Sequence, residues 1–104
     1  MIEINSPSDL TVGILMADVG LVDFWAPWCG PCRALMPTLE ALQANNPSLN
    51  IGKVNVDENP ALAKAAGIRS IPALVLFKNG QAIGTLTGVQ TLERLQQFVD
   101  SAKG

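Results

Sequence analysis

The 104-residue chain contains two cysteines, Cys29 and Cys32, which are separated by two residues. An apolar run over residues 20–25 precedes them and predicts a buried strand, and leucines at helical spacing follow over residues 35–42. The pair therefore lies where a strand is followed by a helix. The first turn of a helix presents unpaired N–H groups and the positive end of the helix dipole, which stabilise an anion such as the Cys29 thiolate. Because this spacing also lets both sulfurs form a disulfide, we predict a redox-active dithiol.

The composition restricts the other kinds of chemistry. The chain contains no histidine, which excludes a histidine general base, a Cys-His hydrolase site and an imidazole metal ligand. A Cys-x-x-Cys pair is also half of a four-cysteine zinc site, but the chain has no third cysteine, so such a site would need a second chain. We therefore expect neither a metal nor a cofactor.

Length and charge predict a small globular protein. The chain suits a single domain, residues 1–104, with 48% hydrophobic and 15% charged residues. A net charge of −2 gives no reason to expect nucleic acid or a membrane surface as a partner. The first residues lack the features of a secretory signal, and no apolar run reaches the roughly 20 residues that span a bilayer. We therefore expect a cytoplasmic protein, in which a lone disulfide is usually catalytic or redox-sensing.

The first twenty residues carry the weakest structural signals. Ile2 and Ile4 alternate with polar residues and predict a short strand. Ser8 or Asp9 is expected to cap a helix after it. The uncharged run 10–17 has no clear period, and the pattern assigns it to neither helix nor strand.

From residue 21 onward the signals are clear. Asn79-Gly80 between two apolar runs predicts a hairpin, Gly67 ends a short alanine-rich helix, and Thr91 is expected to cap the last helix. The expected elements are a strand at 21–25, a helix from 29 to 45, a strand at 49–56, a helix at 61–66, strands at 73–78 and 81–87, and a helix at 92–102.

This order of elements predicts an α/β fold with a central mixed five-stranded sheet flanked by helices on both faces. Strands joined through helices are expected to pair in parallel, and the closing hairpin is expected to add an antiparallel edge.

The segment from Val22 to Cys32, which contains Trp-Cys-Gly-Pro-Cys, resembles the active-site segment of the thioredoxin family. Residues 53–57, 67–72 and 77–80 also occur at the spacings of that family. The resemblance covers the chain from about residue 21 onward. The first twenty residues match poorly, and Ala73 stands where many members carry threonine. The resemblance implies a thioredoxin fold and protein-disulfide reductase activity.

The resemblance implies a separate role for each cysteine. Cys29 is the expected nucleophile that forms a mixed disulfide with a substrate, and Cys32 is the resolving thiol. Gly30 and Pro31 between them carry no titratable group. A histidine there is expected to make the pair more oxidising, so its absence favours a reductant.

Asp23 is the one charged residue inside the apolar strand. Burial should raise the pKa of its carboxyl into the range for proton exchange with Cys32. The thioredoxin family carries a buried acid in that role, and Lys53 matches the lysine that accompanies it. As an isolated residue, Lys53 is equally well interpreted as a surface lysine.

The segment Ile71-Pro72 resembles the cis-proline turn that lies beside the dithiol in the family. Ile71 would offer its backbone N–H and C=O to an extended substrate. Trp28, Gly88 and Val89 are expected to complete an apolar rim around the first cysteine, whereas Trp25 is expected in the core.

The resemblance implies disulfide-containing client proteins as substrates and a flavin-dependent thioredoxin reductase that uses NADPH as the electron donor. We expect a monomer. Two alternatives stay open: a binding module whose dithiol is idle, and a thiol oxidant or isomerase, which would have a higher reduction potential.

Overall fold

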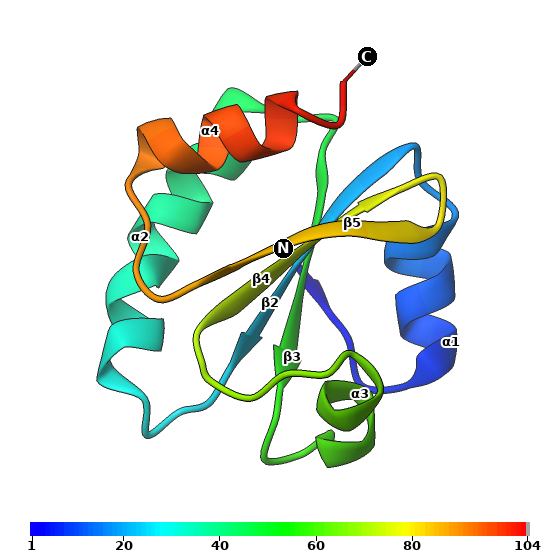
Figure 1. Ribbon diagram of the computed structural model, residues 1–104, viewed down its shortest axis with the longest axis vertical. Coiled ribbons are helices and arrows are strands. Elements are labelled where there is room, and N and C mark those ends of the chain that lie inside the picture. Colours follow the sequence, from blue (N-terminus) through cyan, green and yellow to red (C-terminus); the bar gives the residue numbers. More distant parts are fainter. Residues whose placement is uncertain (104) are drawn as a thin grey trace.

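A computed structural model describes residues 1–103. Its strands form one mixed sheet in the spatial order β1-β3-β2-β4-β5 (Figure 1). Strands β1, β3 and β2 run parallel, and β4 and β5 are antiparallel to their neighbours. The strands are β1 (Ile2–Glu3), β2 (Val19–Trp25), β3 (Asn50–Asn55), β4 (Ala73–Lys78) and β5 (Gln81–Thr87).

Helices cover both faces of the sheet, as the sequence predicts. Figure 1 shows α2 and α4 together on one side and α1 and α3 on the other. No helix within residues 1–103 is long and apolar enough to cross a membrane. The helices are α1 (Pro7–Leu10), a π-helical turn η1 (Thr11–Leu15), α2 (Gly30–Asn45), α3 (Pro60–Ala65) and α4 (Leu92–Asp100).

The local signals after residue 20 are confirmed. The hairpin at Asn79-Gly80 has positive φ at both residues, 50° and 82°, and joins β4 and β5 with the predicted bounds. Thr91 caps α4, and its side chain accepts the Arg94 N–H. Helix α4 ends before Ala102, which the predicted helix had included, although Ala102 is buried.

The predicted cap of the first helix is wrong. Ser6 is the capping residue, because its hydroxyl accepts the Asp9 N–H, and Pro7 takes the first helical position, where a missing N–H costs nothing. The uncharged run that had no assignment forms the end of α1 and the π-helical turn η1.

The predicted direction of β4 is also wrong, because β4 runs antiparallel to β2 although a helix precedes it. Helix α3 has six residues and is about 9 Å long. A six-residue strand is about 20 Å long, so α3 is too short to carry the chain back along β3. The chain therefore enters β4 at the end of the sheet where β2 and β3 finish, with Ala73 opposite Phe24.

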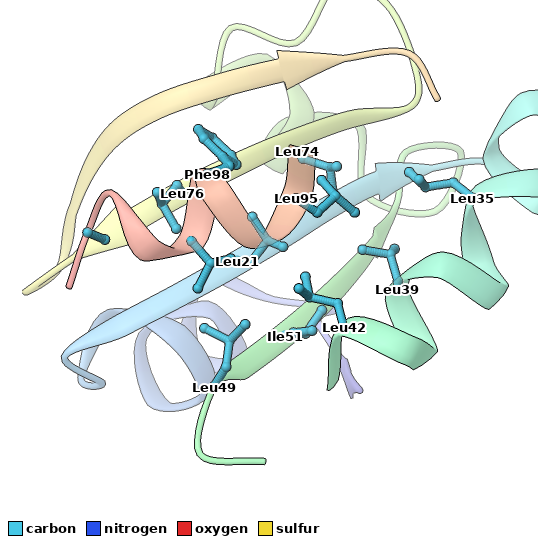
Figure 2. Close-up of a cluster of buried hydrophobic side chains, with 12 residues drawn as sticks. Leu21, Leu35, Leu39, Leu42, Leu49, Ile51, Leu74, Leu76, Leu95 and Phe98 are labelled. Atoms are coloured by element: carbon cyan, nitrogen blue, oxygen red, sulfur yellow. The ribbon is translucent and has the colours of Figure 1, made fainter. Parts of the chain in front are cut away.

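Alternation along β2 divides the core between the two faces of the sheet. Leu21 belongs to the cluster under α2 and α4, and Val22 and Phe24 belong to the cluster under η1 and α3. Figure 2 shows the leucines of α2 pointing toward the strands in the first cluster. By the same alternation, Asp23 and Trp25 lie on the α2/α4 face, beneath the helix that begins at the dithiol.

Candidate active site: a disulfide at the start of a helix

The two cysteines lie at the amino-terminal end of α2 and are joined by a disulfide. Cys29 is the capping residue of the helix, and its sulfur accepts the backbone N–H of Cys32 at 3.2 Å. Cys29 keeps 5% of its surface exposed, whereas Cys32 is fully buried. In the dithiol form, the same N–H and the dipole of a 16-residue helix would face a Cys29 thiolate.

The segment Ile71-Pro72 lies against this disulfide, and the peptide bond between the two residues is cis. The Ile71 carbonyl oxygen is 4.0 Å from the Cys29 sulfur. Gly88, with φ of +82°, donates its N–H to the Pro72 carbonyl oxygen at 2.9 Å, and the neighbouring Val89 is 55% exposed. The structure therefore brings the carboxyl end of β5 to the proline turn.

Trp28 is 68% exposed, and its indole Nε1–H donates to Asp57 Oδ2 at 2.9 Å. This hydrogen bond fixes the ring at the edge of the site. Next to it lies an open hollow of about 420 Å³, lined by Trp28, Val56, Ala63, Ile68, Arg69, Ser70 and Ile71. At Gly30, between the two cysteines, an added side chain would meet no atom of another part of the chain within 4 Å. The surroundings of Cys29 are thus open to a large partner.

Asp23 is completely buried in the centre of β2, as predicted. Neither oxygen of its carboxylate has a hydrogen-bond partner within residues 1–103. Desolvation raises the pKa of Asp23 from 3.8 to about 7, and the positive charge of Lys53 partly opposes this rise. A carboxyl with this pKa exchanges protons readily near neutral pH.

Lys53 is the register partner of Asp23 on the neighbouring strand β3. Its side chain is only 20% exposed, so it is not an ordinary surface lysine. The ammonium lies 5.0 Å from the centre of the Trp25 ring and 3.5 Å from the Glu3 carboxylate. Trp25 itself is half-buried and packs against the small buried cluster of Ala26, Cys29 and Cys32, so it lies at the margin of the core in which it was predicted.

The sequence did not identify Asp57 or Glu3 as part of this region. A signal for Asp57 was present, because β2 and β3 are parallel and the residues that follow them meet at one edge of the sheet. Glu3 had no such signal, because its place beside Lys53 depends on the pairing of β1 with β3.

A metal is not indicated by the arrangement. Within the part of the chain that the structure describes, no three His, Cys, Asp or Glu side chains cluster in a way that would hold an ion. The reactive groups that the structure places at this site are the sulfur pair and the buried Asp23 carboxyl.

Comparison with known proteins agrees with this geometry. The family model named Thioredoxin matches residues 7–101. A thioredoxin from Porphyra purpurea is 49% identical over 81 residues, which are 77% of this chain and 76% of the relative. Thioredoxin 1 from Synechococcus elongatus is 47% identical over 81 residues, with the same coverage.

Solved structures of the same kind superpose closely on the chain. A mutant thioredoxin from Halobacterium salinarum has a TM-score of 0.92 and 37% identity, and the match covers 99% of this chain and 90% of that one. Oxidised mitochondrial thioredoxin 3 from Saccharomyces cerevisiae has a TM-score of 0.89 and 31% identity, covering 97% and 94%. Since family model, relatives and fold agree, this chain belongs to the thioredoxin family and is a protein-disulfide oxidoreductase of the thioredoxin type.

Proposed function

We propose that this protein reduces disulfides in client proteins, with Cys29 as the nucleophile and Cys32 as the resolving thiol. The observation that carries the proposal is that the Cys29 sulfur caps α2 and accepts the Cys32 N–H, while Cys32 is fully buried. A client can approach Cys29 from solvent, whereas Cys32 is within reach only of its partner in the pair. This difference in access supports attack by Cys29 first and by Cys32 second.

The reaction proceeds in two exchanges. The Cys29 thiolate attacks one sulfur of a client disulfide, forms a mixed disulfide and releases the other client sulfur as a thiolate. The Cys32 thiolate then attacks the Cys29 sulfur and releases the second client thiolate. The client gains two electrons and two protons, and the protein is left with the Cys29–Cys32 disulfide.

Asp23 is proposed to take the proton of the Cys32 thiol in the second exchange. A base that takes a proton from a buried thiol works best when its own pKa lies near the working pH, because its protonated and ionised forms then have similar free energies. The buried carboxyl of Asp23, with a pKa of about 7, has this property. Lys53 is proposed to adjust this pKa through its charge, and Gly30 and Pro31 to keep further titratable groups out of the pair.

Client segments are proposed to bind in extended form along the Ile71-Pro72 turn. The Ile71 backbone would pair with the client, as an added strand pairs with a sheet edge. Trp28, Gly88 and Val89 would supply the apolar contacts around Cys29. A shallow, mainly apolar surface of this kind suits exposed loops of many proteins.

The oxidised pair must be returned to the dithiol form after each cycle. We propose that a flavin-dependent thioredoxin reductase supplies these electrons from NADPH. The protein is proposed to work as a single domain and a monomer in the cytoplasm, where thiols are kept reduced.

Serine substitution of each cysteine tests this order of attack. With a model disulfide protein and a chemical or enzymatic reductant, both Cys29→Ser and Cys32→Ser should lose turnover. Only Cys32→Ser should accumulate a mixed disulfide with the client, detectable by mass spectrometry. If Cys29→Ser accumulates the adduct instead, the assignment is reversed. If neither variant slows the reaction, the dithiol is not the site.

A further inference from the structure

Three charged side chains form a row across the sheet. Lys53 on β3 is in register with Asp23 on β2 and with Glu3 on β1. Residues in register on adjacent strands point to the same side of a sheet, so the three side chains share the face that α2 covers. The row runs from the buried Asp23 carboxyl through the Lys53 ammonium to the Glu3 carboxylate at the sheet edge.

The two acids differ in what they contact. Lys53 Nζ is 3.5 Å from a Glu3 carboxylate oxygen, whereas neither oxygen of Asp23 has a hydrogen-bond partner in the described chain. The Glu3 side chain is 61% exposed and Asp23 is completely buried. The ammonium therefore pairs with the acid at the outer edge and not with the one in the core.

The ring of Trp25 holds the other side of the lysine. Its centre is 5.0 Å from Lys53 Nζ, within the range of a cation–π interaction. The lysine head is thus set by one aromatic ring and one carboxylate, both outside hydrogen-bonding contact with Asp23. Of these two groups, only Glu3 carries a negative charge opposite to that of the ammonium.

We propose that Glu3 is a positioning residue that holds the Lys53 ammonium at the edge of the sheet and so limits how strongly Lys53 acts on Asp23. Without Glu3, the flexible lysine stem can turn its head toward the buried carboxylate, which has no other partner. The consequence for catalysis rests on the proposed function, in which Asp23 takes the Cys32 proton.

The groups that face Asp23 from neighbouring elements are few. In register with Asp23 lie Lys53 on strand β3 and the neutral Leu74 on strand β4, and helix α2, which covers this face of the sheet, begins at the cysteine pair. Lys53 is the charged group that changes the pKa of Asp23, in the direction opposite to burial. Moving this one ammonium is therefore a direct way to change the proton affinity of Asp23.

The test is an NMR titration of the Asp23 side-chain carboxyl in the full-length oxidised protein, in which the cysteines do not titrate. In Glu3→Gln, the pKa of Asp23 should fall by about 0.5, the effect of releasing an exposed ion pair. In Lys53→Met, it should rise. In the double variant, the glutamine should add nothing, because Glu3 acts through Lys53.

The Asp100–Lys103 pair provides a matched control, because it has the same 3.5 Å separation and lies in the last turns of the chain. Asp100→Asn removes one carboxylate and should leave the Asp23 titration unchanged. An unchanged Asp23 pKa in Glu3→Gln would overturn the inference. So would an equal fall in the Lys53→Met background or in Asp100→Asn, since each would show a general charge effect.

A kinetic measurement separates this inference from the proposed function. The pH profile of mixed-disulfide resolution should move to lower pH in Glu3→Gln by the same amount as the Asp23 titration. If the titration moves and the profile does not, the positioning role of Glu3 is supported and the role of Asp23 as the base is refuted.

Discussion

Replacing Asp23 with asparagine should make the oxidised protein more stable than the wild type at neutral pH. At pH 4, where the Asp23 carboxyl is protonated in the folded protein, the two proteins should have nearly the same stability. Asp23 is fully buried, and desolvation raises its pKa from 3.8 to about 7. Each tenfold change in proton affinity corresponds to about 1.4 kcal/mol, so the interval corresponds to about 4 kcal/mol of folding free energy. The free energy of unfolding is lower by this amount above pH 7, because the carboxyl ionises freely in the unfolded chain but must stay protonated or ionise inside the core in the folded protein.

The direction follows from proton binding in the two states. Between pH 4 and pH 7, Asp23 is ionised in the unfolded chain but still protonated in the folded protein. The folded state then binds more protons, so the free energy of unfolding falls as the pH rises through this window and levels off above it. Asparagine has no proton to lose, so the variant does not show this decrease.

Urea unfolding of both oxidised proteins at pH 4, 5.5, 7 and 8 measures the effect. The difference in unfolding free energy, variant minus wild type, should grow by about 4 kcal/mol between pH 4 and pH 8. Titrations of all other groups are common to both proteins and cancel in the difference. A difference that stays constant from pH 4 to pH 8 would show that Asp23 is not held neutral by burial, and the proposed base would lose its physical basis.

Three further substitutions test other parts of the structure. Trp28→Phe removes the N–H that donates to Asp57, so kcat/KM for a model disulfide protein should fall about 2- to 10-fold, as expected for one hydrogen bond. An unchanged value would show that the fixed orientation of the ring is unimportant for the reaction. Gly88→Ala should lower the free energy of unfolding, measured with urea, by about 1–2 kcal/mol. The space around the new methyl group is open and φ is +82°, so backbone strain is the only cost. Equal stability would contradict the left-handed conformation. Leu39→Ala should lower the free energy of unfolding by about 2–5 kcal/mol in the same assay, because this side chain is fully buried between α2 and the sheet. In the control Glu40→Ala, at the exposed neighbouring position, the change should be about 0.5 kcal/mol or less. Similar losses in both variants would place Leu39 outside the core.

Local signals predicted most of the elements, because the residues that start and end them act through neighbours in the sequence. The hairpin at Asn79-Gly80 and the cap at Thr91 require backbone or side-chain geometry within three residues. The cap of the first helix was predicted wrongly although its signal is also local. Ser6 and Ser8 are both good capping residues, and only Pro7 between them, which favours the first helical position, decides for Ser6.

Features that depend on contacts across the sheet were beyond the sequence. The direction of β4 depends on the length of α3. The prediction gave this helix the same length of six residues but paired the strands by the order of elements alone, so it missed that such a short helix does not cross the sheet. Glu3 reaches Lys53 only because β1 adds to the free edge of β3. The burial of Asp23 was predicted, because a single charge in an otherwise apolar strand has no exposed face available.

The proposed function requires that Cys29 and Cys32 cycle between the disulfide and the dithiol form as a reductant. The most direct measurement is the equilibrium reduction potential of the pair against a dithiothreitol or glutathione couple at pH 7. We expect a value in the range of reducing thioredoxins, roughly −270 mV. A value above roughly −180 mV, typical of isomerases and oxidants, or a pair that does not exchange with either couple, would contradict a function as a reductant.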